Sequence, residues 1–153
     1  MEIKEKEASD VKELAEFLSK YWETRNMDYS LDWAESYIRK GHKKEIMDDK
    51  FFVAKEDEEI IGSISVVFRE GGVAELRDFY VKEEHRDEGI GDELFEKAFE
   101  FCRERNVRKL HVKIFPYMLN FFKRKGFRAE GVLQDHFEEG EDLIIMGKFL
   151  SEN

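Results

Sequence analysis

The sequence has few cysteines, few prolines and no long apolar run. Cys102 is the only cysteine among 153 residues, so no disulfide can form within the chain. Its neighbours Ala98, Phe99 and Phe101 predict a buried helical thiol rather than a nucleophile. No apolar segment approaches the roughly 20 residues that span a bilayer, and the N-terminus lacks the apolar core of a signal peptide. We therefore expect a soluble cytoplasmic protein.

Positive charge is also scarce relative to negative charge. The chain has 36 acidic and 26 basic residues, which gives a formal net charge of -10. Such a chain is repelled by nucleic acid and by anionic membranes, whereas it attracts a cationic or amine substrate. Apolar residues and charged residues each make up 41% of the chain, which excludes a disordered polymer. The length predicts one domain, residues 1–153, with a small core under a charged surface.

The hydrophobic periodicity changes several times along the chain and predicts a mixture of helices and strands. Helical patterns cover 11–22, capped by Ser9 and Asp10, then 31–41 with Gly41 as the stop signal, 91–105 and 117–125. Alternating patterns predict strands at 2–7, 51–55, 60–68, 73–82, 108–115, 127–134 and 142–149. The three strands between 51 and 82 are joined by short turns and form an antiparallel meander.

The segment 74–91 carries the strongest chemical signal, because a strand there passes through a glycine-bearing turn into a long helix. The N-terminus of a helix presents unpaired backbone N–H groups, and Gly89 and Gly91 let a phosphate approach them closely. The turn therefore suits a pyrophosphate, although such a junction can also be only a tight connection. The spacing matches neither the P-loop nor the full dinucleotide-fold motif.

Arg86, Gly89 and Gly91 fit the Arg/Gln-x-x-Gly-x-Gly/Ala signature, and on these residues the chain resembles the GNAT superfamily of N-acetyltransferases. The preceding strand, 75–81, and the late helix ending in Gly126-Phe127 resemble the corresponding family segments. The resemblance implies an α/β (α+β) fold with a mixed, mostly antiparallel sheet of six to seven strands. About four helices flank that sheet, which is splayed at the cofactor strand.

The resemblance also implies acetyl-coenzyme A as co-substrate and no metal. The backbone of the strand would pair with the pantetheine amides, and the turn would hold the pyrophosphate. The cofactor-binding residues implied in this way are Phe79, Tyr80, Val81, Arg86, Asp87, Glu88, Gly89, Ile90, Gly91 and Asp92.

Two departures from the family pattern bear on the site. Asp87 and Glu88 stand where many relatives carry glycine and a basic residue, which adds negative charge near an anionic cofactor. Asp92 adds to this charge or simply interacts with the helix dipole. Phe122 occupies the position where many relatives place the tyrosine that protonates the thiolate, so Tyr117 or water would replace it.

Acetyl transfer requires a neutral amine, a polarised thioester carbonyl and a stabilised thiolate. Glu75 is the candidate base, since the resemblance places a glutamate near this point of the strand in several relatives; it can equally be a solvated strand carboxylate. Asp78 is a weaker candidate that is expected to pair with Arg77 or another cation. Tyr117 is the candidate acid.

The acceptor pocket in this family is flanked by the connector between the first two helices and by the loop before the last strand. Trp22, Tyr29 and Trp33 lie at the connector among several carboxylates. They suit an amine with an apolar body, or they are ordinary packing residues. The acidic segment 135–142 fits a solvated turn better than a metal site.

The main hypothesis is an acetyl-coenzyme A-dependent N-acetyltransferase in which a primary amine attacks the thioester directly. The amine belongs to a small molecule, a protein N-terminus or a lysine. The alternatives are a catalytically inactive acyl-coenzyme A-binding or regulatory module and a protein-interaction domain that has lost the cofactor. No nucleic-acid or membrane partner is expected; dimers are frequent among the proteins it resembles.

Overall fold

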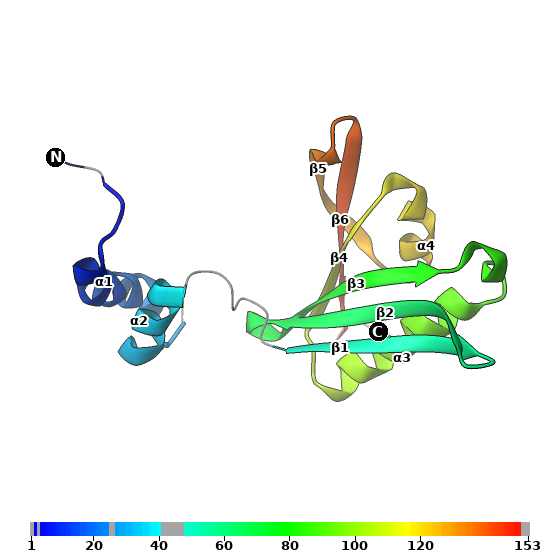
Figure 1. Cartoon of the computed structure of the whole chain (residues 1–153), viewed down its shortest axis with the longest axis horizontal. Coiled ribbons are helices and arrows are strands. Elements are labelled where there is room, and N and C mark those ends of the chain that lie inside the picture. The colour runs from blue at the N-terminus through cyan, green and yellow to red at the C-terminus, as the bar shows by residue number, and fades with distance from the viewer. Residues whose placement is uncertain (1, 3, 25–26, 41–47, 151–153) are drawn as a thin grey trace. The chain divides into compact units, whose positions relative to one another are not determined.

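The computed structural model describes residues 2, 4–24, 27–40 and 48–150. The chain divides into two compact units, residues 1–45 and 46–153. The first unit is a helical hairpin of α1 (Val11–Glu23) and α2 (Leu31–Lys40), drawn in blue and cyan in Figure 1. Both helices follow the predicted periodicity. The predicted stop at Gly41 lies outside the described residues.

The two helices bury a small core of their own. Val11 and Ala15 of α1 pack with Ala34 and Ile38 of α2, and each is less than a tenth exposed. The hydroxyl of Ser30 accepts a hydrogen bond from the backbone N–H of Trp33 at 3.1 Å, which caps the start of α2.

The strand predicted at 2–7 is wrong for the residues that the structure describes. Residues 2 and 4–7 have no strand, and residue 3 lies outside the described part. The segment instead leads into a one-turn 3₁₀ helix, Ala8–Asp10, where the Asp10 carboxylate accepts a hydrogen bond from the Glu7 N–H at 2.8 Å. A weak alternation of charged residues does not hold a strand without a partner strand to pair with.

The second unit contains a sheet of six strands among the described residues (Figure 1). The strands are β1 (Asp48–Glu56), β2 (Glu59–Arg69), β3 (Val73–Val81), β4 (Lys109–Ile114), β5 (Arg128–Glu138) and β6 (Glu141–Phe149). Their order is β1-β2-β3-β4-β6-β5, and only the β3–β4 pair is parallel. The expected mixed, mostly antiparallel sheet is confirmed.

The meander β1–β2–β3 turns where the sequence predicts. Asp57 and Glu58 form the first turn with φ of 47° and 68°, the left-handed conformation that a two-residue hairpin loop needs. Gly71 and Gly72 form the second turn at 74° and 73°.

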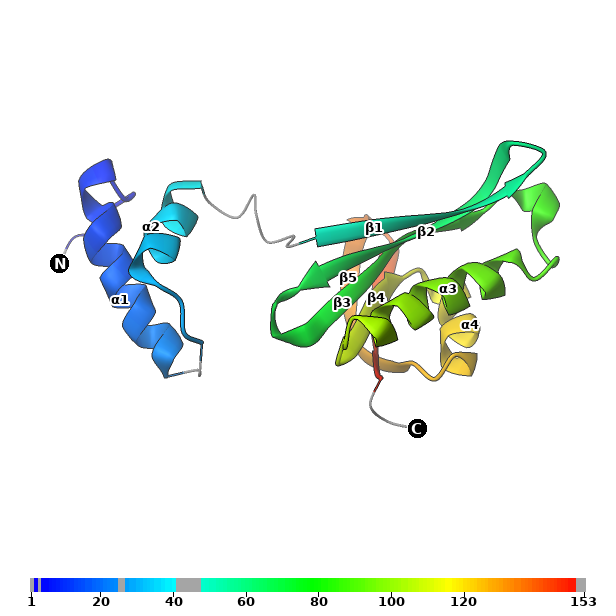
Figure 2. The same ribbon diagram turned by 90° about the horizontal axis from the view of Figure 1, so that it is seen from below.

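One face of the sheet is covered by α3 (Ile90–Glu104) and the short α4 (Leu119–Arg124), as Figure 2 shows. The buried side chains of α3 are Leu94, Phe95, Ala98 and Cys102. Cys102 is fully buried, as predicted, and burial raises the pKa of its thiol to about 12. Among the residues that the structure describes, no helix combines the length and apolar character needed to cross a membrane.

The sheet opens between β3 and β4. Pairing between these two strands covers only Val73–Leu76 of β3, although β3 continues to Val81. Just beyond the last pair, a bulge at Asp78 changes the register between β2 and β3, with Asp78 at φ 51°. The expected splay at the cofactor strand is therefore present, and among the described residues one edge of the end of β3 has no partner strand.

Candidate active site

A cleft of about 530 Å³ lies where the end of β3, the start of α3 and the helix α4 meet. All of the cofactor-binding residues that the family resemblance implies line it, except Glu88. Sequence reasoning did not identify four further lining residues: His85, Met118, Phe121 and Arg124. Arg124 stands at the end of α4, and no local spacing indicates that this helix end faces the start of α3.

Arg86 joins the turn to the end of β3. Its Nε donates a hydrogen bond to the carbonyl oxygen of Val81 at 3.0 Å, and its guanidinium lies 5.5 Å from the ring centroid of Tyr80. The side chain therefore fixes the shape of the turn while its charge remains beside the cleft.

The start of α3 presents free backbone donors to this cleft. Gly89, at φ 81°, precedes the helix, and its carbonyl oxygen accepts the N–H of Glu93 at 3.1 Å. The N–H groups of residues 90–92 come before that bond and have no acceptor within the helix. Gly91 lies beside β3, where a Cβ would be in van der Waals contact with the Phe79 ring at 3.4 Å. This arrangement favours an anion in the cleft.

Asp87, Glu88 and Asp92, the acidic residues that the family comparison singles out, have different surroundings. Glu88 does not line the cleft, and its carboxylate lies 3.2 Å from Nδ1 of His85. The carboxylate of Asp92 forms an ion pair with Nζ of Lys125 at 2.6 Å. Asp87 lines the cleft without such a partner among the described residues. The fold thus offsets the charge of Asp92 and turns Glu88 away from the cleft, while the charge of Asp87 remains.

A second cleft, of about 490 Å³, opens on the splay itself. It shares Phe79, Tyr80, Tyr117 and Met118 with the first cleft, so the two meet beside the unpaired edge of β3. Its charged lining residues are Arg77, Asp78 and Lys113.

Tyr117 stands at the junction of the two clefts. Its side chain is 83% exposed, and its ring stacks on Phe115 with a centroid distance of 6.1 Å. Its phenol is a hydrogen-bond donor on the lining of both clefts. Phe122, by contrast, is fully buried and packs edge-on against Phe79 and Phe127, so it belongs to the core.

Glu75 lies on β3 with only 3% of its surface exposed, and it lines neither cleft. Arg69 and Arg77 each approach its carboxylate to 3.0 Å. Burial alone would raise the pKa of Glu75, but hydrogen bonds from Arg77 and Arg69 outweigh it and hold the pKa below its usual range. The arrangement suits a fixed carboxylate that orders two arginines, and the predicted role as base stays a prediction.

His111 is the register partner of Glu75 on β4, and its Nε2 lies 3.8 Å from the carboxylate. Burial lowers the pKa of His111, although the charge of Glu75 acts in the opposite direction. The imidazole is therefore held neutral near pH 7.

Asp78 is exposed and belongs to the second cleft. The ion pair expected with Arg77 is not formed among the described residues, because Arg77 binds Glu75 instead. The Asp78 carboxylate accepts a hydrogen bond from the Ser65 hydroxyl at 2.6 Å, and its backbone carbonyl accepts one from Ser63 at 2.7 Å. The bulge and these two bonds hold the carboxylate at the splay.

The predicted acceptor residues Trp22, Tyr29 and Trp33 come together within the first unit. Tyr29 and Trp33 stack at 4.2 Å between centroids, and Trp22 meets both rings edge-on at 5.5 and 5.7 Å. They form one aromatic cluster with Tyr37. Their part in acceptor binding stays a prediction.

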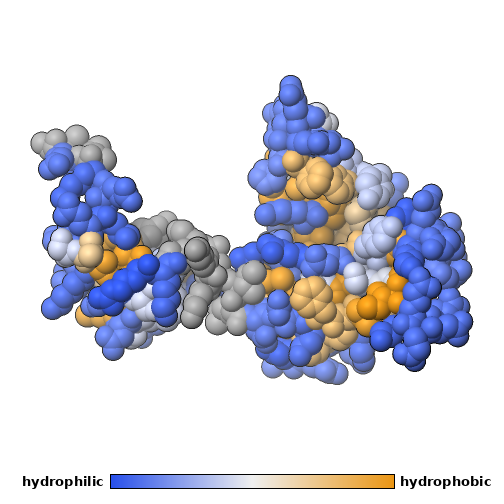
Figure 3. Space-filling view, in the orientation of Figure 1, coloured by the Kyte–Doolittle hydropathy of each residue, from blue (hydrophilic) through white to orange (hydrophobic). Residues whose placement is uncertain are grey.

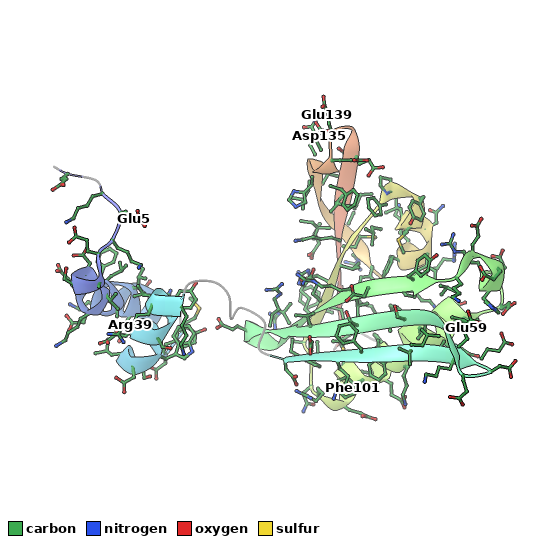
Figure 4. All side chains as sticks on the ribbon, in the orientation of Figure 1. Glu5, Arg39, Glu59, Phe101, Asp135 and Glu139 are labelled. Carbon is green, nitrogen blue, oxygen red and sulfur yellow. The ribbon has the colours of Figure 1, made fainter. Side chains whose placement is uncertain are left out.

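The acidic segment 135–142 forms the tip of the β5–β6 hairpin, where Figure 4 labels Asp135 and Glu139. The carboxylates of Asp135 and Asp142 accept backbone N–H groups of Gly140 and Asp135 at 3.0 and 2.9 Å. These bonds are those of a turn. In the described ranges, no three acidic, histidine or cysteine side chains are grouped as a metal site requires.

A sequence model of the acetyltransferase (GNAT) family matches residues 11–127 of the chain. A Bacillus subtilis protein named as a ribosomal-protein-alanine N-acetyltransferase is 27% identical over 84 residues, which cover 52% of this chain and 55% of that protein. The chain spans about half the length of the first curated relatives that it matches.

Two solved structures show the same fold. Ribosomal-protein-alanine N-acetyltransferase from Brucella melitensis superposes with a TM-score of 0.59 at 24% identity, covering 98% of this chain and 100% of that one. An acetyltransferase from Elizabethkingia anophelis, solved with acetyl-CoA bound, superposes with a TM-score of 0.61 at 19% identity, over 79% and 84% of the two chains.

Proposed function

Because the chain belongs to the acetyltransferase (GNAT) family, we propose that it transfers an acetyl group from acetyl-coenzyme A to a primary amine. The acceptor amine is carried by a small molecule, a protein N-terminus or a lysine. We further propose that residues 1–153 act as one domain, since the family match at 11–127 includes residues of both compact units.

The observation that carries the proposal is the cleft in which an unpaired strand edge meets a helix N-terminus. Beyond Leu76, β3 has no partner on its β4 side, so residues 79–81 can pair with the two amides of a pantetheine arm. The N–H groups at the start of α3 and the charge of Arg124 suit a pyrophosphate. An extended, anionic thioester cofactor needs both features side by side.

The reaction is a direct attack of the amine nitrogen on the thioester carbon. The C–S bond breaks as the C–N bond forms, the nitrogen loses a proton, and the thiolate gains one. A backbone N–H of the open strand edge can polarise the carbonyl oxygen. Tyr117, at the junction of the clefts, is the proposed acid for the thiolate. Asp78 lines the second cleft, where we place the acceptor amine. It is therefore better placed than the enclosed Glu75 to take the proton from the nitrogen.

Calorimetric titration with acetyl-coenzyme A tests the cofactor site. Gly89→Trp places an indole where a Cβ meets no atom within 4 Å, at a backbone φ of 81°. Gly71→Trp is a matched control, because Gly71 also has open space around it and a φ of 74° but lies at the β2–β3 turn. The two variants share the strain of a side chain in the left-handed region and differ only in place.

We expect micromolar binding by the wild type and by Gly71→Trp, and none by Gly89→Trp. Equal binding by all three proteins would show that the cofactor does not bind at this turn. Absence of binding by the wild type would contradict the proposal and favour the interaction-domain alternative. Release of coenzyme A in the presence of amines then separates an enzyme from an inactive cofactor-binding module.

A further inference from the structure

The splay brings two cations together at its start. Leu76 and Val112 are the last register pair of β3 and β4, so Arg77 and Lys113 are the next residues on the two strands. Both line the second cleft. Like charges at neighbouring positions of adjacent strands are destabilising unless a counter-charge lies between them.

The charge of Arg77 is satisfied, whereas that of Lys113 is not. Arg77 binds the carboxylate of Glu75 through Nε at 3.0 Å. Lys113 is exposed and forms no ion pair with any residue that the structure describes. Its partner in the β4–β6 register is Ile145, and the residue paired with Ile145 on β5 is Gly131. The strands beside Lys113 at this level thus offer no carboxylate.

The carboxylate of Asp78 lines the same cleft, but its hydrogen-bond partner is Ser65 and not Lys113. Asp78 is fixed by Ser65 at 2.6 Å and by its bulged backbone. The cleft therefore presents a fixed anion, a cation without a counter-ion and an apolar floor that includes Leu76, Val112 and Phe122. Of the three charged side chains that line this cleft, that of Lys113 alone has no ion-pair or hydrogen-bond partner among the described residues.

We infer that the acceptor is a primary amine that also carries a carboxylate, such as a free α-amino acid, with its carboxylate on Lys113 and its ammonium on Asp78. The inference rests on the proposed acetyltransferase function and names its substrate class. Asp78 holds the nitrogen at the side of the cleft that meets the cofactor cleft through Tyr80 and Tyr117. Lys113 is a specificity-determining residue, because it discriminates between amines and contacts no reacting atom.

Matched pairs of acceptors test this assignment: phenylalanine with phenethylamine, and lysine with cadaverine. In each pair the second amine lacks the carboxylate. The kcat/KM of each acceptor is measured from coenzyme A release by the wild type, Lys113→Met, Lys113→Glu and Asp78→Asn. Lys97→Met is the control, since Lys97 is an exposed lysine on α3 whose only described ion pair is a loose one with Glu100 at 3.9 Å.

We expect the wild type and Lys97→Met to prefer the carboxylate-bearing acceptor of each pair. Lys113→Met should lower kcat/KM for that acceptor about tenfold and leave the decarboxylated amine unchanged. Lys113→Glu should reverse the preference, whereas Asp78→Asn should lower both values alike. Acetylation of both acceptors with preferences unaltered by Lys113→Met overturns the inference alone. Acetyl-coenzyme A binding with none of these four amines acetylated also overturns the inference; the acetyltransferase proposal fails only if peptides with a free N-terminus or a lysine are not acetylated either.

Discussion

At the scale of single residues, Glu75 shows how packing decides the role of a carboxylate. Its charge lies between Arg69 and Arg77, each with an ion-pair distance of 3.0 Å. Glu75→Gln removes the charge that both guanidinium groups approach, while it keeps the shape of the side chain. We expect a loss of about 2 kcal/mol in unfolding free energy at pH 7, below the range for fully enclosed pairs because the arginines are partly exposed. Urea unfolding of both proteins measures it.

The same variant has a predicted pH dependence. The folded pKa of Glu75 is lowered from 4.5, so its stabilisation is complete above the unfolded pKa and is lost as pH falls through the folded value. The stability difference between wild type and Glu75→Gln should therefore shrink on acidification below about pH 4.5. A difference that is the same at pH 3 and pH 7 would contradict the ion-pair account. A large fall in kcat with unchanged stability would instead support Glu75 as base.

Tyr117→Phe tests the proposed acid. The phenol is 83% exposed and stands at the junction of the clefts, and the substitution removes only a hydroxyl. We expect kcat to fall by about 100-fold with little change in KM for acetyl-coenzyme A, as for a group that acts in the transition state. Tyr80→Phe removes the other phenol common to both clefts and should retain most of the activity. Equal rates for wild type and Tyr117→Phe would assign thiolate protonation to water.

At the scale of elements, α3 and α4 are joined by Lys125, which follows α4. Its Nζ lies 2.6 Å from Asp92 in the first turn of α3 and 3.7 Å from Glu96. Lys125→Met leaves the Asp92 carboxylate uncompensated beside the proposed pyrophosphate position. We expect acetyl-coenzyme A to bind about fivefold more weakly, the equivalent of about 1 kcal/mol.

The double variant Lys125→Met/Asp92→Asn provides the control, because it removes the carboxylate together with its partner. Binding close to that of the wild type is expected from it, as measured by the same calorimetric titration. If the double variant binds as weakly as the single one, Lys125 acts by packing against Phe95 and Phe121, whose centroids lie 5.2 and 5.5 Å from its Nζ.

These elements also show which features a sequence can predict. The strand, turn and helix from β3 to α3 are encoded by local signals: alternation, two glycines at fixed spacing and a helical stripe. The Lys125–Asp92 pair and the approach of Arg124 to the cleft depend on tertiary packing, so no spacing indicates them. The predicted strand at 2–7 is not formed by the described residues, because pairing partners decide a weakly alternating segment.

Glu75 and Asp78 illustrate the same limit within one strand. Alternation places Glu75 off the helix-covered face, but only the structure shows that Arg69 and Arg77 enclose it. The sequence favoured Glu75 over Asp78 as base, and it paired Asp78 with Arg77. The structure gives the two residues the opposite surroundings. Arginines enclose Glu75, whereas the bulge leaves Asp78 at the cleft with Ser65 as its hydrogen-bond partner.

At the scale of the whole molecule, the face drawn in Figure 3 is mostly hydrophilic, with apolar side chains gathered over parts of each unit. The chain carries a net charge of -10, while its proposed cofactor is itself anionic. Long-range repulsion should therefore oppose their encounter, even though Arg86 and Arg124 line the cleft. The range of that repulsion depends on salt: about 30 Å at 0.01 M ionic strength and about 8 Å at 0.15 M.

We expect the association rate constant of acetyl-coenzyme A to rise with ionic strength between these two limits. Added salt screens the repulsion by distant acidic residues more than it screens the attraction by the cations beside the cleft. Stopped-flow measurements across this salt range give the slope. Arg124→Gln should keep the sign of the slope and lower every rate. A rate constant that falls with salt would contradict this account. It would show that attraction by the cations of the cleft outweighs repulsion by the net charge.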